Sequence, residues 1–353
     1  MLKVLFTSDY EIHGNGEGLP DALLIEPTDR MIDSFDRYGA KLTIMADVSE
    51  IMKFREYLET SGKDDYSYHG VIDQLKRAVG GGHDVQLHIH SAYYNAVHRD
   101  GKWMLDWSEY DLTGLEKERI NEIVKTGKSF LEEHLKAVRP DYSCMAFRSA
   151  NWSMSPSENI VDALIDNSIT IDTSVFKYGK RKGIVTFDYS HAESDLVPWP
   201  LDKSDVCRRS DSSPIFEFPI YTEKRSIWKF LTFNRLYRVY HSRMHPVRMP
   251  RLDSDKPVKT KKASPLSKLT SKHPWKMDFN QCSGKQLIEG LRSAEKKYAH
   301  LKVDLPFVLI GHSKLFTAQN ERSLRPFLQY VKNHPDRYSF AVFGDFDLDD
   351  YRR

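Results

Sequence analysis

The sequence predicts an α/β protein whose mainly parallel strands alternate with helices and close into a distorted barrel of about seven strands. Short apolar runs recur along the chain, and most of them are followed by a stretch with helical periodicity. An open, doubly wound sheet is the second interpretation of the same alternation. We predict one domain over residues 1–353, with a basic insertion at residues 222–276.

The first half of the chain contains regular strand–helix units. The predicted strands are Lys3–Thr7, Lys41–Ala46, Val85–His90 and Cys144–Arg148. The predicted helices are Pro27–Tyr38, Ser49–Thr60, Val71–Val79, Leu115–Leu135 and a helix that Ser155 caps, Pro156 opens and Asp166 ends.

The second half continues this pattern on both sides of the insertion. Predicted strands are Ile169–Asp172, Phe216–Ile220, Phe307–Gly311 and Ser339–Phe343, and predicted helices are Gln286–Tyr298 and Leu324–Val331. No repeat of fixed period is present.

The segment Thr222–Lys276 differs from the rest in charge. It contains 15 Lys and Arg against 3 Asp and Glu, a net charge of +12. Residues Ile227–Tyr240 predict an amphipathic basic helix, and Asp255–Lys272, rich in Lys, Ser and Pro, predicts a mobile loop. We expect a peripheral contact with a membrane or a protein partner here; the alternative is a solvated lysine-rich loop.

Composition excludes several classes of protein. The 353 residues carry 52 Lys and Arg against 50 Asp and Glu, and nothing in them predicts a nucleic-acid-binding fold. No apolar run approaches the roughly 18 residues of a membrane helix, and the N-terminal residues lack the apolar stretch of a signal peptide. Three widely spaced cysteines, Cys144, Cys207 and Cys282, argue against a disulfide framework. We expect a cytoplasmic protein, with a peripheral position at the inner face of the membrane as an option.

Ionisable residues stand at the ends of five predicted strands. Asp9 and Glu11 follow the first strand, and their i, i+2 spacing on an extended backbone points both carboxylates the same way. His88 and His90 repeat that spacing at the end of the third strand. The other three are Arg148, Asp172 and His312. Strand ends are where α/β folds assemble sites from residues that are distant in sequence.

These residue types suit metal-assisted hydrolysis. One carboxylate and two imidazoles can hold a divalent metal, a second carboxylate can take a proton from water, and a histidine can protonate a leaving group. Each residue alone is as typical of a turn, a cap or a structural ion pair. Their shared position at strand ends is what favours a site.

The order of these motifs resembles the polysaccharide deacetylase superfamily, carbohydrate esterase family 4. The resemblance covers roughly residues 3–220 and 277–345 and rests on Thr7–Glu11, Gly82–His88, Phe147–Trp152, Leu309–His312 and Asp172–Val175. It implies Asp9 as the catalytic base, Arg148 as the residue that orients it and His312 as the catalytic acid. It also implies Glu11 and His88 as metal ligands, with zinc the expected divalent metal.

The chain departs from the family pattern at one ligand. The family's second metal histidine lies four residues after the first, where this chain has Ala92. His90 is the nearest substitute and completes the expected set, with His98 as an alternative if the loop folds back. Subgroups of surface-polysaccharide biosynthesis proteins have a His-x-His-Pro version of this loop, which this chain resembles more closely.

The resemblance implies removal of an acyl group, usually acetyl, from an amino sugar. We expect a nucleotide- or lipid-linked amino sugar of surface-polysaccharide or lipopolysaccharide biosynthesis, contacted by Trp152, Asp172, Tyr93 and Asn151. The alternatives are a catalytically impaired relative that binds a glycan or a pathway partner, and a small-amide hydrolase on the same barrel. The sequence leaves the oligomeric state open.

Overall fold

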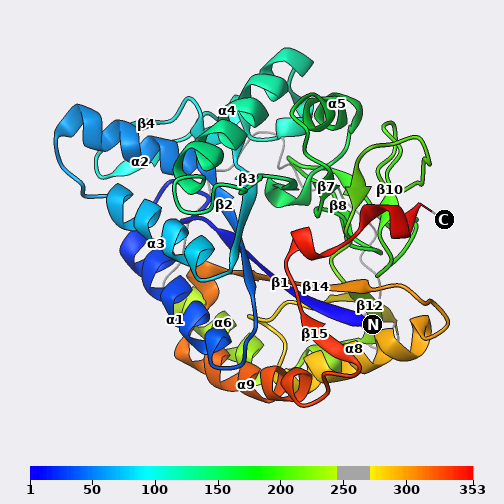
Figure 1. The fold of residues 1–353 in the computed structure, drawn as a ribbon. Helices are drawn as coiled ribbons and strands as arrows, with labels where there is room; N and C mark the ends of the chain where they lie inside the picture. Colours follow the sequence, from blue (N-terminus) through cyan, green and yellow to red (C-terminus); the bar gives the residue numbers. More distant parts are fainter. Residues whose placement is uncertain (245–270, 353) are drawn as a thin grey trace.

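The computed structural model describes residues 1–244 and 271–352 and shows a curled sheet with helices around its outer side (Figure 1). The strands follow the order β10-β11-β7-β6-β3-β2-β1-β14, and β15 branches onto β1. Seven of these strands form one continuous parallel run: β1 (Leu2–Tyr10), β2 (Leu42–Asp47), β3 (Asp84–Ile89), β6 (Ala146–Ser149), β7 (Ile171–Asp172), β11 (Phe216–Glu217) and β14 (Leu305–His312).

The sheet curls back toward its own start. A single parallel bridge joins Ile220, just after β11, to Val308 of β14. The prediction of a distorted α/β barrel is therefore confirmed, with an irregular seam where this bridge and a second isolated bridge, from Asp278 to Ile310 of β14, replace a continuous ladder.

The remaining strands are short. β15 (Tyr338–Phe340) pairs in parallel with β1, and β10 (Trp199–Pro200) pairs antiparallel with β11. Three separate ribbons are β4 (Val97–Arg99) with β5 (Lys102–Met104), β8 (Lys180–Arg181) with β9 (Phe187–Asp188), and β12 (Thr222–Ser226) with β13 (Lys272–Lys276).

The helices that cover the sheet agree with the predicted units. They are α1 (Glu26–Asp36), α2 (Val48–Ser61), α3 (Tyr68–Gly80), α4 (Lys117–Leu135), α5 (Glu158–Asp166), α8 (Gly284–Tyr298) and α9 (Ala318–Lys332). The predicted start of α5 is wrong. Ser157 occupies the N-cap, because the Ser155 carbonyl accepts a hydrogen bond from the Thr113 hydroxyl at 3.1 Å and stays outside the helix.

The core lies on both faces of the central strands. Val4, Leu5 and Phe6 follow one another in β1 and all three are fully buried. A parallel strand covered on both faces reads as a continuous apolar run, which explains why this element was visible in the sequence. The Phe6 ring packs against Phe35 of α1 and Phe327 of α9, with ring centroids 4.5 and 6.0 Å apart.

The ends of the basic segment lie side by side, since Thr222 of β12 pairs with Lys276 of β13.

The predicted single helix over Ile227–Tyr240 is wrong in detail. It is a 3-10 helix, η6 (Ile227–Phe230), followed by α6 (Phe233–Met244). The predicted loop Asp255–Lys272 falls almost entirely outside the described residues.

Two expectations from composition can be compared with the described residues. Cys144, Cys207 and Cys282 are buried and free. Within residues 1–244 and 271–352, no helix combines the length and the apolar character that crossing a bilayer requires.

Candidate metal and acid–base site

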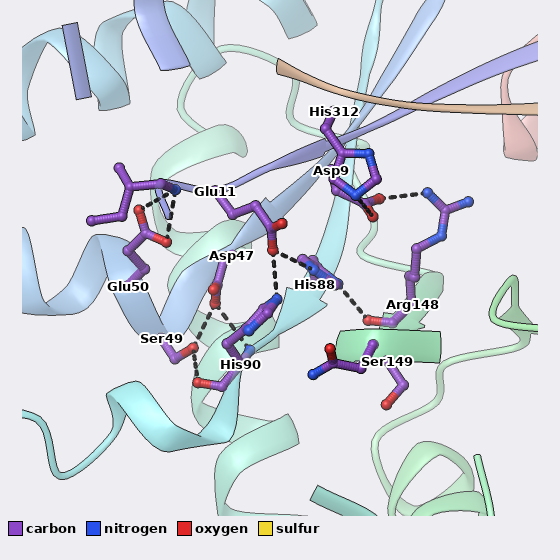
Figure 2. A network of polar contacts seen from close by, with 12 residues as sticks. Asp9, Glu11, Asp47, Ser49, Glu50, His88, His90, Arg148, Ser149 and His312 are labelled. Carbon is purple, nitrogen blue, oxygen red and sulfur yellow. Dashed lines mark hydrogen bonds and ion pairs between the residues drawn. The ribbon is translucent and has the colours of Figure 1, made fainter. Parts of the chain in front are cut away.

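The strand ends bring the predicted ionisable residues to one level of the sheet. Asp9 of β1 stands in register with His312 of β14, and His88 of β3 stands in register with Arg148 of β6. Between them, β2 ends at Asp47, the register partner of His88. Figure 2 shows these side chains converging from the strand ends.

Glu11 lies at the centre of a carboxylate–imidazole cluster. Its Oε2 atom lies 3.2 Å from His88 Nε2 and 2.5 Å from His90 Nε2. One ligand atom from each residue falls within 4.8 Å of the other two. His88 and His90 therefore point to the same side, as their i, i+2 spacing predicts.

Contacts behind the cluster orient its histidines. His88 Nδ1 lies 2.8 Å from the Arg148 carbonyl oxygen, which can only accept, so Nδ1 donates and Nε2 faces Glu11. Asp47 accepts a hydrogen bond from the backbone N–H of His90 at 3.2 Å. Such outer contacts are typical of histidines that ligate a metal, so the donor set fits a divalent cation that prefers nitrogen and oxygen.

Charge in the cluster changes the affinity of His88 for protons. Burial by itself would lower the pKa of His88, but the hydrogen bond to Glu11 and the negative charges of Asp9 and Glu11 raise it to about 9. Without a metal, His88 therefore binds a proton that a metal would have to displace.

Lys314 also contacts the central carboxylate. Its ammonium nitrogen lies 2.8 Å from Glu11 Oε1 and donates to the Ile12 carbonyl at 2.6 Å. Burial favours the neutral form of Glu11, but Lys314 and His90 hold its pKa well below the usual range. Glu11 is thus a carboxylate shared by one ammonium and two imidazoles.

Asp9 forms the second half of the site with Arg148. The Asp9 Oδ1 atom accepts from Arg148 Nη1 at 2.6 Å. Arg148 is fully buried and also donates to the Thr7 hydroxyl at 2.8 Å and the Thr173 carbonyl at 3.0 Å. Burial opposes ionisation of Asp9, but Arg148 and then His312 lower its pKa below the ordinary value. Asp9 is therefore a fixed carboxylate that stays ionised.

His312 faces Asp9 from the adjacent strand. Its Nε2 atom lies 3.5 Å from Asp9 Oδ2, and its backbone N–H donates to the Asn280 side chain at 2.7 Å. Burial lowers the pKa of His312 despite the nearby carboxylates, so the neutral imidazole is favoured. The Nδ1 atom is buried and has no hydrogen-bond partner among the described residues.

One predicted substrate residue, Trp152, lies beside His312, and a second, Asn151, precedes it in the chain. The Trp152 ring meets the His312 ring edge-on at 6.3 Å, and the Lys276 ammonium lies 3.4 Å from the Trp152 ring centroid. Asn151 accepts from Arg181 at 3.0 Å. In the described part of the chain, Asn151 Nδ2 and Trp152 Nε1 are buried without a hydrogen-bond partner.

Asp172 and Tyr93, the other two predicted substrate residues, are buried and have partners inside the protein. Asp172 is fully buried, accepts from Ser174 at 2.7 Å and stands in register with buried Glu217. Tyr93 is 1% exposed and donates to the His13 carbonyl at 3.1 Å. Their role as substrate contacts stays a prediction.

The alternative ligand His98 is engaged elsewhere. Its Nε2 atom lies 3.0 Å from the Tyr66 hydroxyl, and its ring packs against Tyr57 and Trp103. Ala92, at the position of the usual second histidine, is buried. The structure thus favours His90 over His98 as the third member of the cluster.

Sequence reasoning missed two charged residues of the site. Asp47 directly follows the predicted strand Lys41–Ala46, so the rule that identified the other strand ends would have found it. Lys314 stands two residues after His312, in the 3-10 turn η8 (Ser313–Leu315), and no spacing pattern marks it.

Comparisons with known proteins concern the fold. No protein-family model matches the sequence, and no curated protein matches it. Puue allantoinase is 12% identical, with a TM-score of 0.51 over 98% of this chain and 88% of that one. TK1436, a GH57 branching enzyme from Thermococcus kodakaraensis, is 11% identical, with a TM-score of 0.50 over 99% and 71%. A Mycobacterium smegmatis protein assigned as a polysaccharide deacetylase is 13% identical, with a TM-score of 0.49 over 98% and 88%. The chain therefore shares its curled α/β fold with proteins of different activities, and its own reaction has to be argued from its site.

Proposed function

We propose that the protein is a metal-dependent hydrolase that removes an acyl group, N-acetyl in the first instance, from an amino sugar. The observation that carries this proposal is the placement of the Glu11–His88–His90 cluster beside the Asp9–His312 pair. A site for a Lewis acid and an acid–base pair at one sheet edge is the equipment that amide hydrolysis needs.

A zinc or similar divalent ion held by Glu11, His88 and His90 would supply Lewis acidity toward the amide carbonyl. Asp9, kept ionised by Arg148, accepts a proton from the attacking water. The neutral His312 imidazole, with Nε2 3.5 Å from Asp9 Oδ2, takes that proton from Asp9 and delivers it to the departing nitrogen, so that a C–O bond forms and the C–N bond then breaks. The products are a carboxylate and the free amino sugar.

Polar atoms of His312 and of the adjacent pair Asn151–Trp152 support a hydroxyl-rich substrate. His312 Nδ1, Trp152 Nε1 and Asn151 Nδ2 are buried and lack a hydrogen-bond partner among the described residues. Because buried polar atoms are normally paired, these three suit the oxygens of a sugar and its acyl group. The substrate we propose is a nucleotide- or lipid-linked amino sugar of surface-polysaccharide or lipopolysaccharide biosynthesis, deacylated in the cytoplasm. Three free, buried cysteines suit that reducing compartment.

A second candidate is a catalytically impaired relative that binds a glycan or a pathway partner. Two observations favour it: Ala92 replaces a family ligand, and the Lys314 ammonium lies 2.8 Å from the carboxylate that a metal would need. The two candidates differ in whether the purified protein holds a metal and turns over substrate.

The test combines metal analysis with activity. We expect about one divalent ion per chain in wild type and in His98→Ala, and loss of the ion in His88→Ala and Glu11→Gln. Deacylation of N-acetylated amino sugars should fall together with the metal, and Asp9→Asn should abolish activity while keeping the metal. Wild type that cannot be loaded with metal would favour the impaired relative. Activity only on small amides would favour the third interpretation, a small-amide hydrolase.

A further inference from the structure

The insertion carries an apolar surface that the proposed reaction does not use. Eight of the fourteen large apolar side chains that are exposed in the described residues lie between Trp228 and Met244. We define the apolar face as the six that are 60–67% exposed: Trp228, Leu231, Phe233, Leu236, Tyr240 and Met244. A concentration of this kind in one short segment is typical of an interaction site.

Helix α6 contacts the barrel through Asn234 and not through its apolar side. At about 100° per residue, Phe233, Leu236, Tyr240 and Met244 fall on one side of the helix. Asn234 lies on another side and is buried. Its amide nitrogen donates to the Cys282 carbonyl and the Ser323 hydroxyl, both at 3.1 Å. The usual arrangement of a surface helix, with apolar residues inward, is therefore reversed.

Further contacts hold this reversed helix in place. The Thr232 hydroxyl, just before α6, donates to the Gln281 carbonyl at 2.9 Å. Lys229 of η6 pairs with Glu289 of α8 at 2.8 Å, and the Gln286 side chain donates to the Lys229 carbonyl at 2.6 Å. The apolar face is thus presented outward by specific bonds to three parts of the barrel.

The charge of the segment narrows the choice of partner. Residues 227–244 include Lys229, Arg235, Arg238 and Arg243 and no acidic residue. A second copy of the chain would bring two such basic segments together, which like-charge repulsion opposes. The following residues, 245–270, contain seven Lys and Arg, two Asp, and no Phe, Trp or Tyr. A basic segment without aromatic rings is a poor partner for a surface that is itself basic and aromatic, so we do not expect this part of the chain to cover the apolar face.

We propose that the apolar face binds the surface of a bilayer that contains anionic phospholipids. Trp228 and Tyr240 are side chains that favour the headgroup level, Phe233 and Leu236 supply apolar contact, and the arginines attract anionic headgroups. The contact is peripheral, with η6 and α6 lying in the plane of the membrane surface.

Two hydrogen bonds at neighbouring residues link the chain just before α6 to the candidate active site. Gln281, which accepts from Thr232, adjoins Asn280, whose side chain accepts from the backbone N–H of His312. Membrane binding would hold this edge of the barrel near lipid headgroups, where a lipid-linked sugar is presented. This consequence for the substrate rests on the proposed function, whereas the membrane contact itself does not.

The test measures vesicle binding by the full chain. Co-sedimentation compares vesicles of phosphatidylcholine alone with vesicles containing about one third phosphatidylglycerol, at low and high salt. The variant Leu236→Glu/Tyr240→Glu reverses the chemistry of the face at two exposed positions, so its folding should be unchanged by circular dichroism. Val97→Glu, 61% exposed in the β4–β5 ribbon, is the matched control.

We expect wild type and Val97→Glu to bind the anionic vesicles equally and to release at high salt. The double variant should bind at least about tenfold more weakly, because two apolar contacts are lost and two negative charges are added. Equal binding by wild type and the double variant, or no binding by wild type, would overturn the proposal. So would a wild-type dimer in sedimentation that the double variant abolishes, since the face would then be covered by a second copy. None of these measurements depends on catalysis. A failed deacylation assay would therefore contradict the proposed function and leave the test of membrane binding unaffected.

Discussion

The buried ion pair between Asp9 and Arg148 makes a quantitative prediction for stability. Arg148→Met removes a guanidinium that is fully buried and donates to Asp9, Thr7 and Thr173. The Asp9 carboxylate, only 3% exposed, is then left without its closest cation. Breaking a buried pair in this way costs about 3–5 kcal/mol of unfolding free energy.

The sign of the pH dependence follows from Asp9. In wild type its pKa is lowered, so its contribution to stability is present above the ordinary carboxyl range and is lost as the pH falls through the folded-state value. In Arg148→Met the pKa of Asp9 rises, and protonation relieves the unpaired charge. We therefore expect the difference between wild type and variant to be largest near pH 7.5 and to shrink at pH 5.

Urea-induced unfolding, followed by circular dichroism at both pH values, measures this difference. The double variant Asp9→Asn/Arg148→Met, which removes the charge as well as its partner, should recover a large part of the loss. The control is Lys180→Met, which breaks the ion pair between Lys180 and Asp188. Both of these side chains are more than half exposed, so the urea midpoint should hardly shift. A loss below about 1 kcal/mol in Arg148→Met, or no recovery in the double variant, would refute the reasoning.

Three further predictions concern the metal cluster, the support of His312 and the cysteines. Because the metal-free pKa of His88 is raised to about 9, its contribution to stability is complete below about pH 6.5 and is lost as the pH rises through 9. Zinc affinity, measured by chelator competition, should accordingly increase from pH 6.5 to 9, and a pH-independent affinity would contradict this assignment. Gly311→Ala would place a methyl group 2.1 Å from the Phe279 ring, so we expect a loss of about 1–3 kcal/mol in urea unfolding. Gly344→Ala, whose new methyl meets only Met145 Sδ at 4.0 Å, is its control, and equal losses in both would show that steric overlap is not the cause. The three buried thiols, whose pKa values burial raises, should react with a thiol reagent only in denaturant, and rapid reaction of the native protein would disprove their burial.

The fold was predictable because its strands are buried on both faces. Continuous apolar runs marked β1, β2 and β14, and the helical periodicity between the strands required parallel crossovers. The irregular seam was not predictable, since β7 and β11 are two residues long and their pairing depends on contacts far apart in sequence.

The site was predictable where strand register alone decides the outcome. Asp9, His88, Arg148 and His312 end neighbouring parallel strands, so their convergence follows from the order of the strands. Asp172 also ends a strand, but its side chain turns toward Glu217, a partner on β11 that no local pattern reveals. Lys314 reaches Glu11 from a turn, and a turn geometry of this kind is not encoded by spacing.

The β12–β13 ribbon has a consequence for how the protein can diverge. The two strands return the chain to the point where it left the barrel, and Asp278, two residues after β13, already bridges to Ile310 beside the site. The length of chain between them can therefore change without displacing His312. By contrast, one residue gained or lost within β14 would shift Asp9 and His312 out of register. The structure therefore separates a segment whose length can vary from a strand ladder whose length sets the geometry of the site.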